Sequence, residues 1–162
     1  MSTLTVVSNS TPLIALSHID KLDLLKQYFS EIIIPDAVYH EVVVEGGDRY
    51  GAKEIKKLDW VKVTSVRNAL AVTALETIVD KGEAEAITLA AEIKSRLLLI
   101  DDAEGRKTAL GMGLNITGTV GIILMAAKDG KLDLKNTLDH LLSAGFRLSD
   151  KEYQRIIGLL AK

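Results

Sequence analysis

Apolar residues follow two different patterns along the chain. Short, nearly unbroken runs of aliphatic and β-branched residues alternate with longer segments in which apolar residues recur every three or four positions. The first pattern is typical of buried strands and the second of amphipathic helices. The runs predict strands at Thr3–Ser8, Ile32–Ile34, Trp60–Thr64, Leu97–Ile100 and Leu114–Thr117.

Helices are predicted between and after these strands. Ser10 or Thr11 can cap the first helix, with Pro12 in its first turn. The last helix carries a capping box formed by Ser149 and Glu152. The remaining pattern predicts helices at Leu22–Phe29, Pro35 to about Val44, Ala52–Leu58, Lys81–Lys94, Glu104–Met112, Thr119–Lys128, Leu134–Ala144 and Asp150–Leu160.

Strands that alternate with helices predict an α/β fold, a three-layer α/β/α arrangement around a central, mainly parallel sheet. The chain has no internal repeat, low-complexity tract or long linker. We therefore expect a single domain over residues 1–162, with residues 132–162 as a C-terminal helical extension. Ligand sites in such sheets form at the carboxyl ends of the strands.

The composition narrows the classes of function. The 162 residues carry a formal net charge of −2, so a nucleic-acid partner would depend on a local basic patch. The absence of cysteine excludes disulfides and thiolate zinc sites. Neither a signal-peptide pattern nor an apolar stretch long enough to cross a membrane is present, so we expect a cytoplasmic protein.

Acidic or amide side chains stand at four places where the apolar pattern predicts burial. They are Asn9, Glu41, Glu83 and the pair Asp101-Asp102. A buried carboxylate is unfavourable unless a cation lies beside it. Several that converge from distant parts of one domain therefore suggest a metal site.

Helix geometry supports Glu83 most clearly. Glu83 lies on the apolar line of its helix with Ile87 and Ala90, whereas Glu85 and Glu92 are expected on the solvated side. The alternative is that Glu83 only favours the positive N-terminal end of the helix, but that role would suit Glu85 almost as well.

The other candidates have structural alternatives that stay open. Glu41 is surrounded by valines on its helix and could form a structural salt bridge. Of Asp101 and Asp102, one could cap the following helix while the other binds metal. Asn9 alone could be an ordinary turn residue.

Nearby polar residues add less. The segment Thr117–Gly121 could present hydroxyl or amide donors but is too short for a phosphate loop. Arg106 and Lys107 could hold a phosphate or form a solvated helix face. His18, His40 and His140 have no metal-ligand spacing.

Hard oxygen ligands without cysteine or paired histidine favour Mg²⁺ or Mn²⁺ over zinc. A carboxylate-held divalent ion at strand ends suits phosphodiester hydrolysis, although phosphatases and phosphotransferases use the same chemistry.

A resemblance narrows this choice. Five segments resemble, in order, the successive motifs of PIN-domain proteins, and the match is closest to a prokaryotic PIN-like branch. It covers roughly Val6 to Lys131 and rests on Val6–Ile14, Ile34–Val42, Lys81–Ile87, Leu98–Arg106 and Thr117–Gly121.

The resemblance implies a parallel sheet with an acidic pocket holding Mg²⁺ or Mn²⁺. It also implies endoribonuclease activity on single-stranded RNA, as in the toxin ribonucleases of toxin–antitoxin pairs, and hence a possible antitoxin-like protein partner. Glu41, Glu83 and an aspartate of the Asp101-Asp102 pair match the family's acidic residues, and the register suggests Asp102. Both aspartates remain candidate metal ligands.

Asn9 departs from the family pattern, which has an aspartate at this position. An amide oxygen can ligate Mg²⁺, but it brings no negative charge and cannot act as a base. Two functions follow: a metal-dependent ribonuclease, or a catalytically weakened PIN-like domain that binds RNA or a protein partner. We also expect a homodimer, because the chain is apolar for its size and the segments Leu124-Met125 and Ile156–Leu160 offer apolar surface.

Overall fold

The computed structural model describes residues 5–47 and 50–160. Within these residues, five strands form one sheet in the order β3-β2-β1-β4-β5, and every neighbouring pair is parallel. This confirms the α/β fold class and the parallel sheet. The strands are β1 Val6–Ser8, β2 Ile32–Ile34, β3 Val61–Val63, β4 Leu97–Leu99 and β5 Ile116–Thr117.

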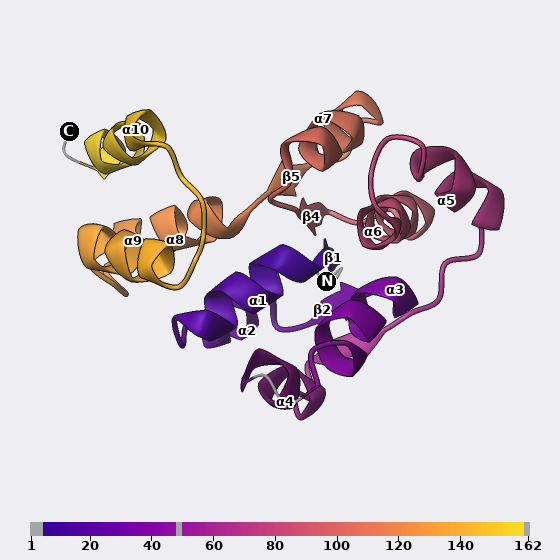
Figure 1. Cartoon of the computed structure of the whole chain (residues 1–162), viewed down its shortest axis with the longest axis horizontal. Coiled ribbons are helices and arrows are strands. Elements are labelled where there is room, and N and C mark those ends of the chain that lie inside the picture. Colours follow the sequence, from indigo (N-terminus) through magenta and orange to yellow (C-terminus); the bar gives the residue numbers. More distant parts are fainter. Residues whose placement is uncertain (1–4, 48–49, 161–162) are drawn as a thin grey trace.

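Helices cover both faces of this sheet (Figure 1). One predicted helix, from Pro35 to Val44, is an α-helical turn that continues as a π-helix. The helices are α1 Ser10–His18, α2 Asp23–Phe29, α3 Asp36–Tyr39, the π-helix η1 His40–Val44, α4 Tyr50–Lys56, α5 Ala69–Leu75, α6 Lys81–Glu92, α7 Ala103–Gly111, α8 Thr119–Lys128, α9 Leu134–Ser143 and α10 Asp150–Leu160.

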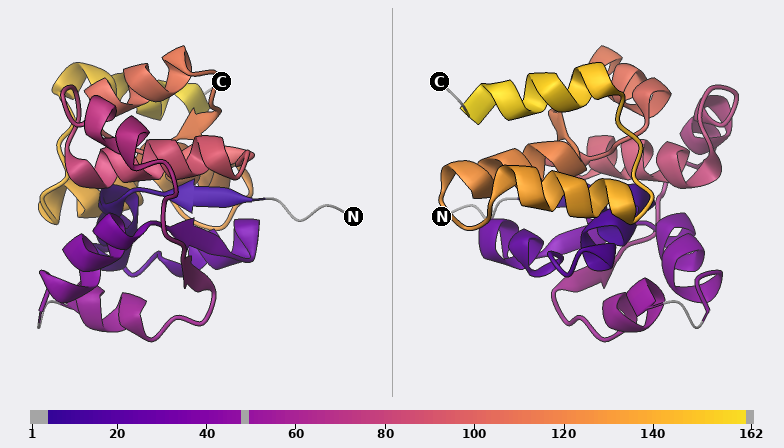
Figure 2. Two further views of the ribbon diagram at one scale, coloured as in Figure 1. Left: turned by 90° about the vertical axis from the view of Figure 1, so that its right-hand side faces the viewer. Right: turned by 60° about the vertical axis from the view of Figure 1, so that its left-hand side comes forward.

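Alternation along the strands divides the buried residues between two cores. Val6 and Leu99 face a core with α1, α2, α8 and α9, whereas Val7, Leu98 and Ile100 face a second core with α6 and α7. The two groups of helices lie on opposite sides of the strands in both views (Figures 1 and 2). A strand buried on both faces explains the unbroken aliphatic run at Leu97–Ile100.

Two boundaries at the start of the chain differ from the sequence prediction. The first strand begins at Val6, and Thr3 and Leu4 of the predicted strand lie outside the described residues. The first helix begins at Ser10 with Asn9 as its N-cap residue, so neither Ser10 nor Thr11 caps it.

Helix α5 was absent from the sequence prediction. Its N-cap is Asn68, whose side chain accepts a hydrogen bond from Ala71 N at 3.0 Å. Val72 is buried, but Leu70 is 80% exposed, so the segment carries no clear apolar stripe.

The expectation that Glu85 and Glu92 lie on the solvated side of α6 holds only in part. Both are half-buried, because each carboxylate accepts hydrogen bonds from a segment packed beside α6. Glu85 accepts from Ala37 N at 3.0 Å, and Glu92 accepts from the backbone N–H groups of Arg67 and Asn68.

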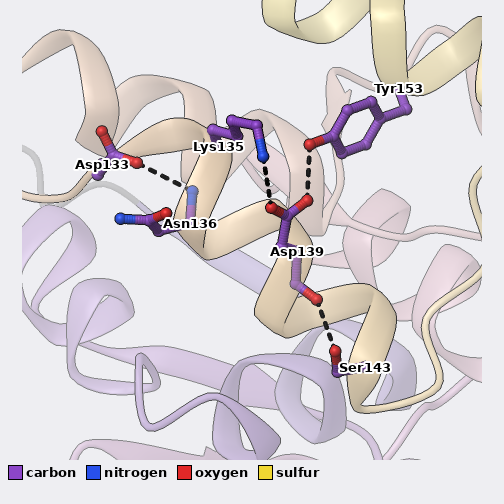
Figure 3. A network of polar contacts seen from close by, with 6 residues as sticks. All are labelled: Asp133, Lys135, Asn136, Asp139, Ser143 and Tyr153. Carbon is purple, nitrogen blue, oxygen red and sulfur yellow. Dashed lines mark hydrogen bonds and ion pairs between the residues drawn. The ribbon is translucent and has the colours of Figure 1, made fainter.

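The C-terminal helices are held together by a polar network (Figure 3). Tyr153 Oη on α10 donates to Asp139 Oδ1 on α9 at 2.6 Å, and Lys135 Nζ donates to Asp139 Oδ2 at 2.9 Å. The predicted capping box is present, since Glu152 N donates to Ser149 Oγ at 3.1 Å and Ser149 N donates to Glu152 Oε1 at 3.3 Å. These contacts fix the position of α10 on α9.

One part of the expected apolar surface is not available. Ile156 is only 3% exposed and belongs to the first core, whereas Leu159 is 53% exposed. No helix within the described residues is long and apolar enough to cross a membrane.

Candidate active site

The carboxyl ends of β1, β4 and β5 lie side by side at one edge of the sheet. Asn9 N donates to Leu99 O at 2.9 Å, and Ile100 N donates to Thr117 O at 2.8 Å. These backbone hydrogen bonds continue the parallel register beyond the last strand residues. They place Asn9 and Asp101, which follow β1 and β4, at the same edge.

Asn9 and Glu41 meet beside Gly82. A Cβ atom at Gly82 would lie 3.1 Å from Glu41 Oε2 and 3.6 Å from both Asn9 Oδ1 and Asp80 Oδ1. Oxygens from three separate parts of the chain therefore surround one glycine at the start of α6. Asn9 is 4% exposed and its side chain does not cap α1, so its amide oxygen is left facing Gly82.

Glu83 lies at the buried side of the same helix end. It is 8% exposed, and its N–H donates to the N-cap residue Asp80 at 2.8 Å. Burial, followed by the negative charges of Asp80 and Asp102, raises the pKa of Glu83 to about 7. A carboxyl group with such a pKa exchanges a proton near neutral pH.

The two adjacent aspartates face different neighbours. Asp102 is exposed, caps α7 by accepting from Gly105 N at 2.9 Å, and acts electrostatically on Glu83. Asp101 accepts from Thr119 N at 2.7 Å and from Thr119 Oγ1 at 2.6 Å. Burial raises the pKa of Asp101, while the Thr119 hydrogen bonds and the Arg106 charge oppose that rise.

The candidates thus separate into two groups. Asn9, Glu41 and Asp80 meet at Gly82, Glu83 follows on the same helix, and the charge of Asp102 acts on Glu83. We refer to this region around Gly82 and Glu83 as the acidic pocket. Asp101 is turned toward the start of α8. The alternative in which one aspartate caps the helix applies to Asp102, and its second oxygen remains able to bind a ligand.

Asp80 is a pocket residue that the sequence reasoning missed. A signal was present, because Asp80-Lys81-Gly82-Glu83 has the spacing of a helix-capping box at the start of the helix predicted at Lys81–Lys94. Thr119 was included only within the Thr117–Gly121 segment, and its bonds with Asp101 show which hydroxyl and amide in that turn are used.

The donor chemistry of the pocket fits a hard divalent cation. Its ligand atoms are carboxylate and amide oxygens, and Ser10 Oγ, next to Asn9, is buried without a hydrogen-bond partner. Among the described residues, no three histidine or acidic side chains are close enough to hold an ion by themselves. Asn9 and oxygens from solvent or substrate would have to complete a ligand set.

The sequence matches a family model described as a PIN domain over residues 5–162. The chain therefore belongs to the PIN-domain family, whose members have nuclease-like functions, generally use divalent metals and bind RNA. No curated protein matches the sequence.

Proposed function

We propose that this PIN-domain chain is a metal-dependent endoribonuclease that hydrolyses phosphodiester bonds of single-stranded RNA. The observation that carries the proposal is the gathering of Glu41, Asn9 and Asp80 oxygens around Gly82, with Glu83 next along the same helix. These oxygens come from elements far apart in sequence, at the sheet edge where α/β proteins form their sites.

Mg²⁺ or Mn²⁺ would be held by Asn9, Glu41, Glu83 and Asp102, with Asp101 beside them. Bound there, the ion would offset charge on the scissile phosphate and promote ionisation of a water molecule. The chain's own contribution is to orient the oxygens. Glu83, with a pKa raised to about 7, is the group best suited to take or give a proton at neutral pH.

A catalytically weakened domain that binds RNA or a protein partner is the second candidate. Asn9 favours it, because an amide supplies neither negative charge nor a base at the end of β1. The homodimer and an antitoxin-like partner belong to this proposal in either form, and the exposed Leu159 on α10 supports such a contact.

Three proteins distinguish the two candidates: the unchanged chain, Asn9→Asp and Glu83→Gln. At an effective dielectric of about 20, one added charge near a divalent ion contributes a few kcal/mol at most before solvent screening. We expect Asn9→Asp to bind Mg²⁺ or Mn²⁺ roughly tenfold more tightly and to cleave RNA faster. Glu83→Gln should lose both properties.

Calorimetric metal titration and cleavage of a labelled single-stranded RNA provide the measurements. Glu31→Gln is the matched control, because Glu31 is exposed and immediately precedes β2, at the opposite edge of the sheet. If Asn9→Asp leaves metal affinity unchanged and no variant cleaves RNA, the binding-domain alternative replaces the nuclease.

A further inference from the structure

A second cleft lies beside the acidic pocket at the same edge of the sheet. Its volume is about 320 Å³, and Asp101 and Gly118 form the end nearest the strands. Three arginines line it: Arg106 from α7, Arg147 from the segment after α9, and Arg155 from α10. Guanidinium groups from three elements far apart in sequence therefore converge on one space.

The arginines exceed the acidic groups available to them. Within the described part of the chain, the side chains of Arg147 and Arg155 form no hydrogen bond or ion pair, and both residues are exposed. Arg106 Nη1 donates to the backbone oxygen of Ile100 at 3.1 Å. An arginine stays protonated at any physiological pH, so the cleft carries positive charge.

The two carboxylates in the cleft are already engaged. Both oxygens of Asp101 accept hydrogen bonds from Thr119. Glu152 Oε1 accepts from the backbone N–H and the hydroxyl of Ser149 in the capping box. The free donors of Arg147 and Arg155 are thus left for an anion, and a guanidinium binds phosphate in a bidentate manner.

Phe146 connects this cleft to an apolar pocket. That pocket has a volume of about 200 Å³, and its wall on α1 includes Ile14 and Ala15. Phe146 lines both spaces. The charged cleft and the apolar pocket therefore lie next to each other, as a phosphate group and a nucleobase do in a nucleic acid. An aromatic ring is the usual stacking partner of an unpaired base.

The network in Figure 3 sets the position of Arg155. Tyr153, two residues before Arg155, is hydrogen-bonded to Asp139, and Ile156 is buried in the core immediately after it. Arg155 is therefore presented from a fixed helix, although its own side chain is exposed.

We propose that the cleft of Arg106, Arg147 and Arg155 binds the phosphodiester backbone of single-stranded RNA, with an unpaired base against Phe146 in the adjoining apolar pocket. The inference rests on the proposed function, because it supplies the local basic patch that a chain of net charge −2 needs for RNA. A duplex does not fit it, since paired bases cannot enter the apolar pocket.

Fluorescence anisotropy with a labelled single-stranded RNA in metal-free buffer tests the cleft without cleavage. The double variant Arg147→Gln/Arg155→Gln should bind about tenfold more weakly. The slope of log affinity against log salt should decrease by about 1.4, because single strands lose ~0.7 for each phosphate contact removed. Lys128→Gln/Lys151→Gln is the control of equal charge change, and both lysines are exposed outside the cleft.

Phe146→Leu tests the base separately. It should weaken single-stranded RNA binding roughly fivefold or more, because stacking contributes ~1–3 kcal/mol per base, and it should leave the salt slope unchanged. Thermal denaturation of each variant shows that it is folded.

Three results would overturn the inference. They are an arginine variant with the affinity and salt slope of the unchanged protein, equal binding of duplex RNA, and displacement of RNA by polyglutamate at equal charge, which would assign the cleft to an acidic protein segment. Failure of the proposed function is distinguishable. If RNA binding depends on the arginines but no variant cleaves RNA, the RNA-binding cleft is supported and the nuclease proposal is rejected. If RNA is cleaved but binding does not depend on the arginines, only the proposal for the cleft is rejected.

Discussion

The acidic pocket and the arginine cleft share one edge of the sheet but differ in how their charges are balanced. Around Gly82 and Glu83, carboxylates approach one another, and burial together with the charges of Asp80 and Asp102 raises the pKa of Glu83 to about 7. In the cleft, both oxygens of Asp101 accept hydrogen bonds from Thr119, and neither Arg147 nor Arg155 forms an ion pair with a described residue. One side thus gathers negative charge and the other positive charge, and Asp101 and Asp102 mark the boundary between them.

The largest expected effect is a loss of stability in a variant that disturbs the arginine cleft. In Gly118→Ala, the new Cβ would overlap Asp101 Oδ1 and lie 3.0 Å from Arg106 Nη1 and 3.1 Å from Ile100 O. Asp101 would have to leave Thr119, and a largely buried carboxylate would lose its partners. We expect a loss of about 3 kcal/mol in unfolding free energy, measured by chemical denaturation.

Gly111→Ala is the control for this glycine substitution. No atom lies within 4 Å of a Cβ at Gly111, so its unfolding free energy should change by less than ~1 kcal/mol. A Gly118→Ala protein as stable as the control would mean that Asp101 is not held as described.

A smaller effect is expected in the acidic pocket, where Glu83 makes the stability of the protein depend on pH. Between pH 4.5 and about 7, the folded protein retains the Glu83 proton that the unfolded chain releases, so stability falls as pH rises through this window. Metal-free Glu83→Gln should therefore be more stable than the unchanged protein by about 2 kcal/mol near pH ~8. Below pH 4.5 the two proteins should be equally stable.

The whole rise in the pKa of Glu83 would correspond to a larger stability difference than this, since each pKa unit is ~1.4 kcal/mol. We expect a smaller value because Asp80 and Asp102 are exposed and solvent partly screens their charges. Denaturation across the pH range measures the difference. Exposed Glu31→Gln provides the comparison. A stability difference between Glu83→Gln and the unchanged protein that does not vary with pH would contradict the raised pKa of Glu83.

The smallest effect is expected for the hydrogen bond between Tyr153 and Asp139, which positions the helix that carries Arg155. Tyr153→Phe removes the hydroxyl that donates to Asp139 while it keeps the ring. The hydrogen bonds from Tyr153 and Lys135 lower the pKa of Asp139, so the variant should raise that pKa, as measured by NMR titration. Tm should fall by roughly two degrees, and Tyr39→Phe should change neither quantity.

The burial of Glu83 was predictable from sequence, and the arginine cleft was not. Glu83 stands out because a carboxylate on an apolar helix line conflicts with the local pattern, and the structure buries it. Arg147 and Arg155 conflict with nothing, since exposed arginines are ordinary in a loop and on a C-terminal helix. Their convergence depends on how α10 packs on α9, which is a long-range contact that periodicity does not specify.

Local periodicity also failed where a tertiary contact changed the environment. Glu85 and Glu92 lie on the polar side of α6, yet each binds backbone N–H groups of a neighbouring segment. The parallel sheet was predictable, because the aliphatic runs needed burial on both faces. Asp80 was missed because its capping role is local and its neighbours Glu41 and Asn9 are distant in sequence.

In helix α10 only Ile156 is buried, while Tyr153, Ile157 and Leu160 pack against the core from partly buried positions. Most of its positions are therefore open to substitution without disturbance of the sheet. In the course of evolution, such a helix can acquire or lose arginines while the carboxylates at the strand ends stay under separate constraint. If the proposed function holds, relatives of this protein can then differ in the RNA that they bind and still use the same carboxylates for the reaction.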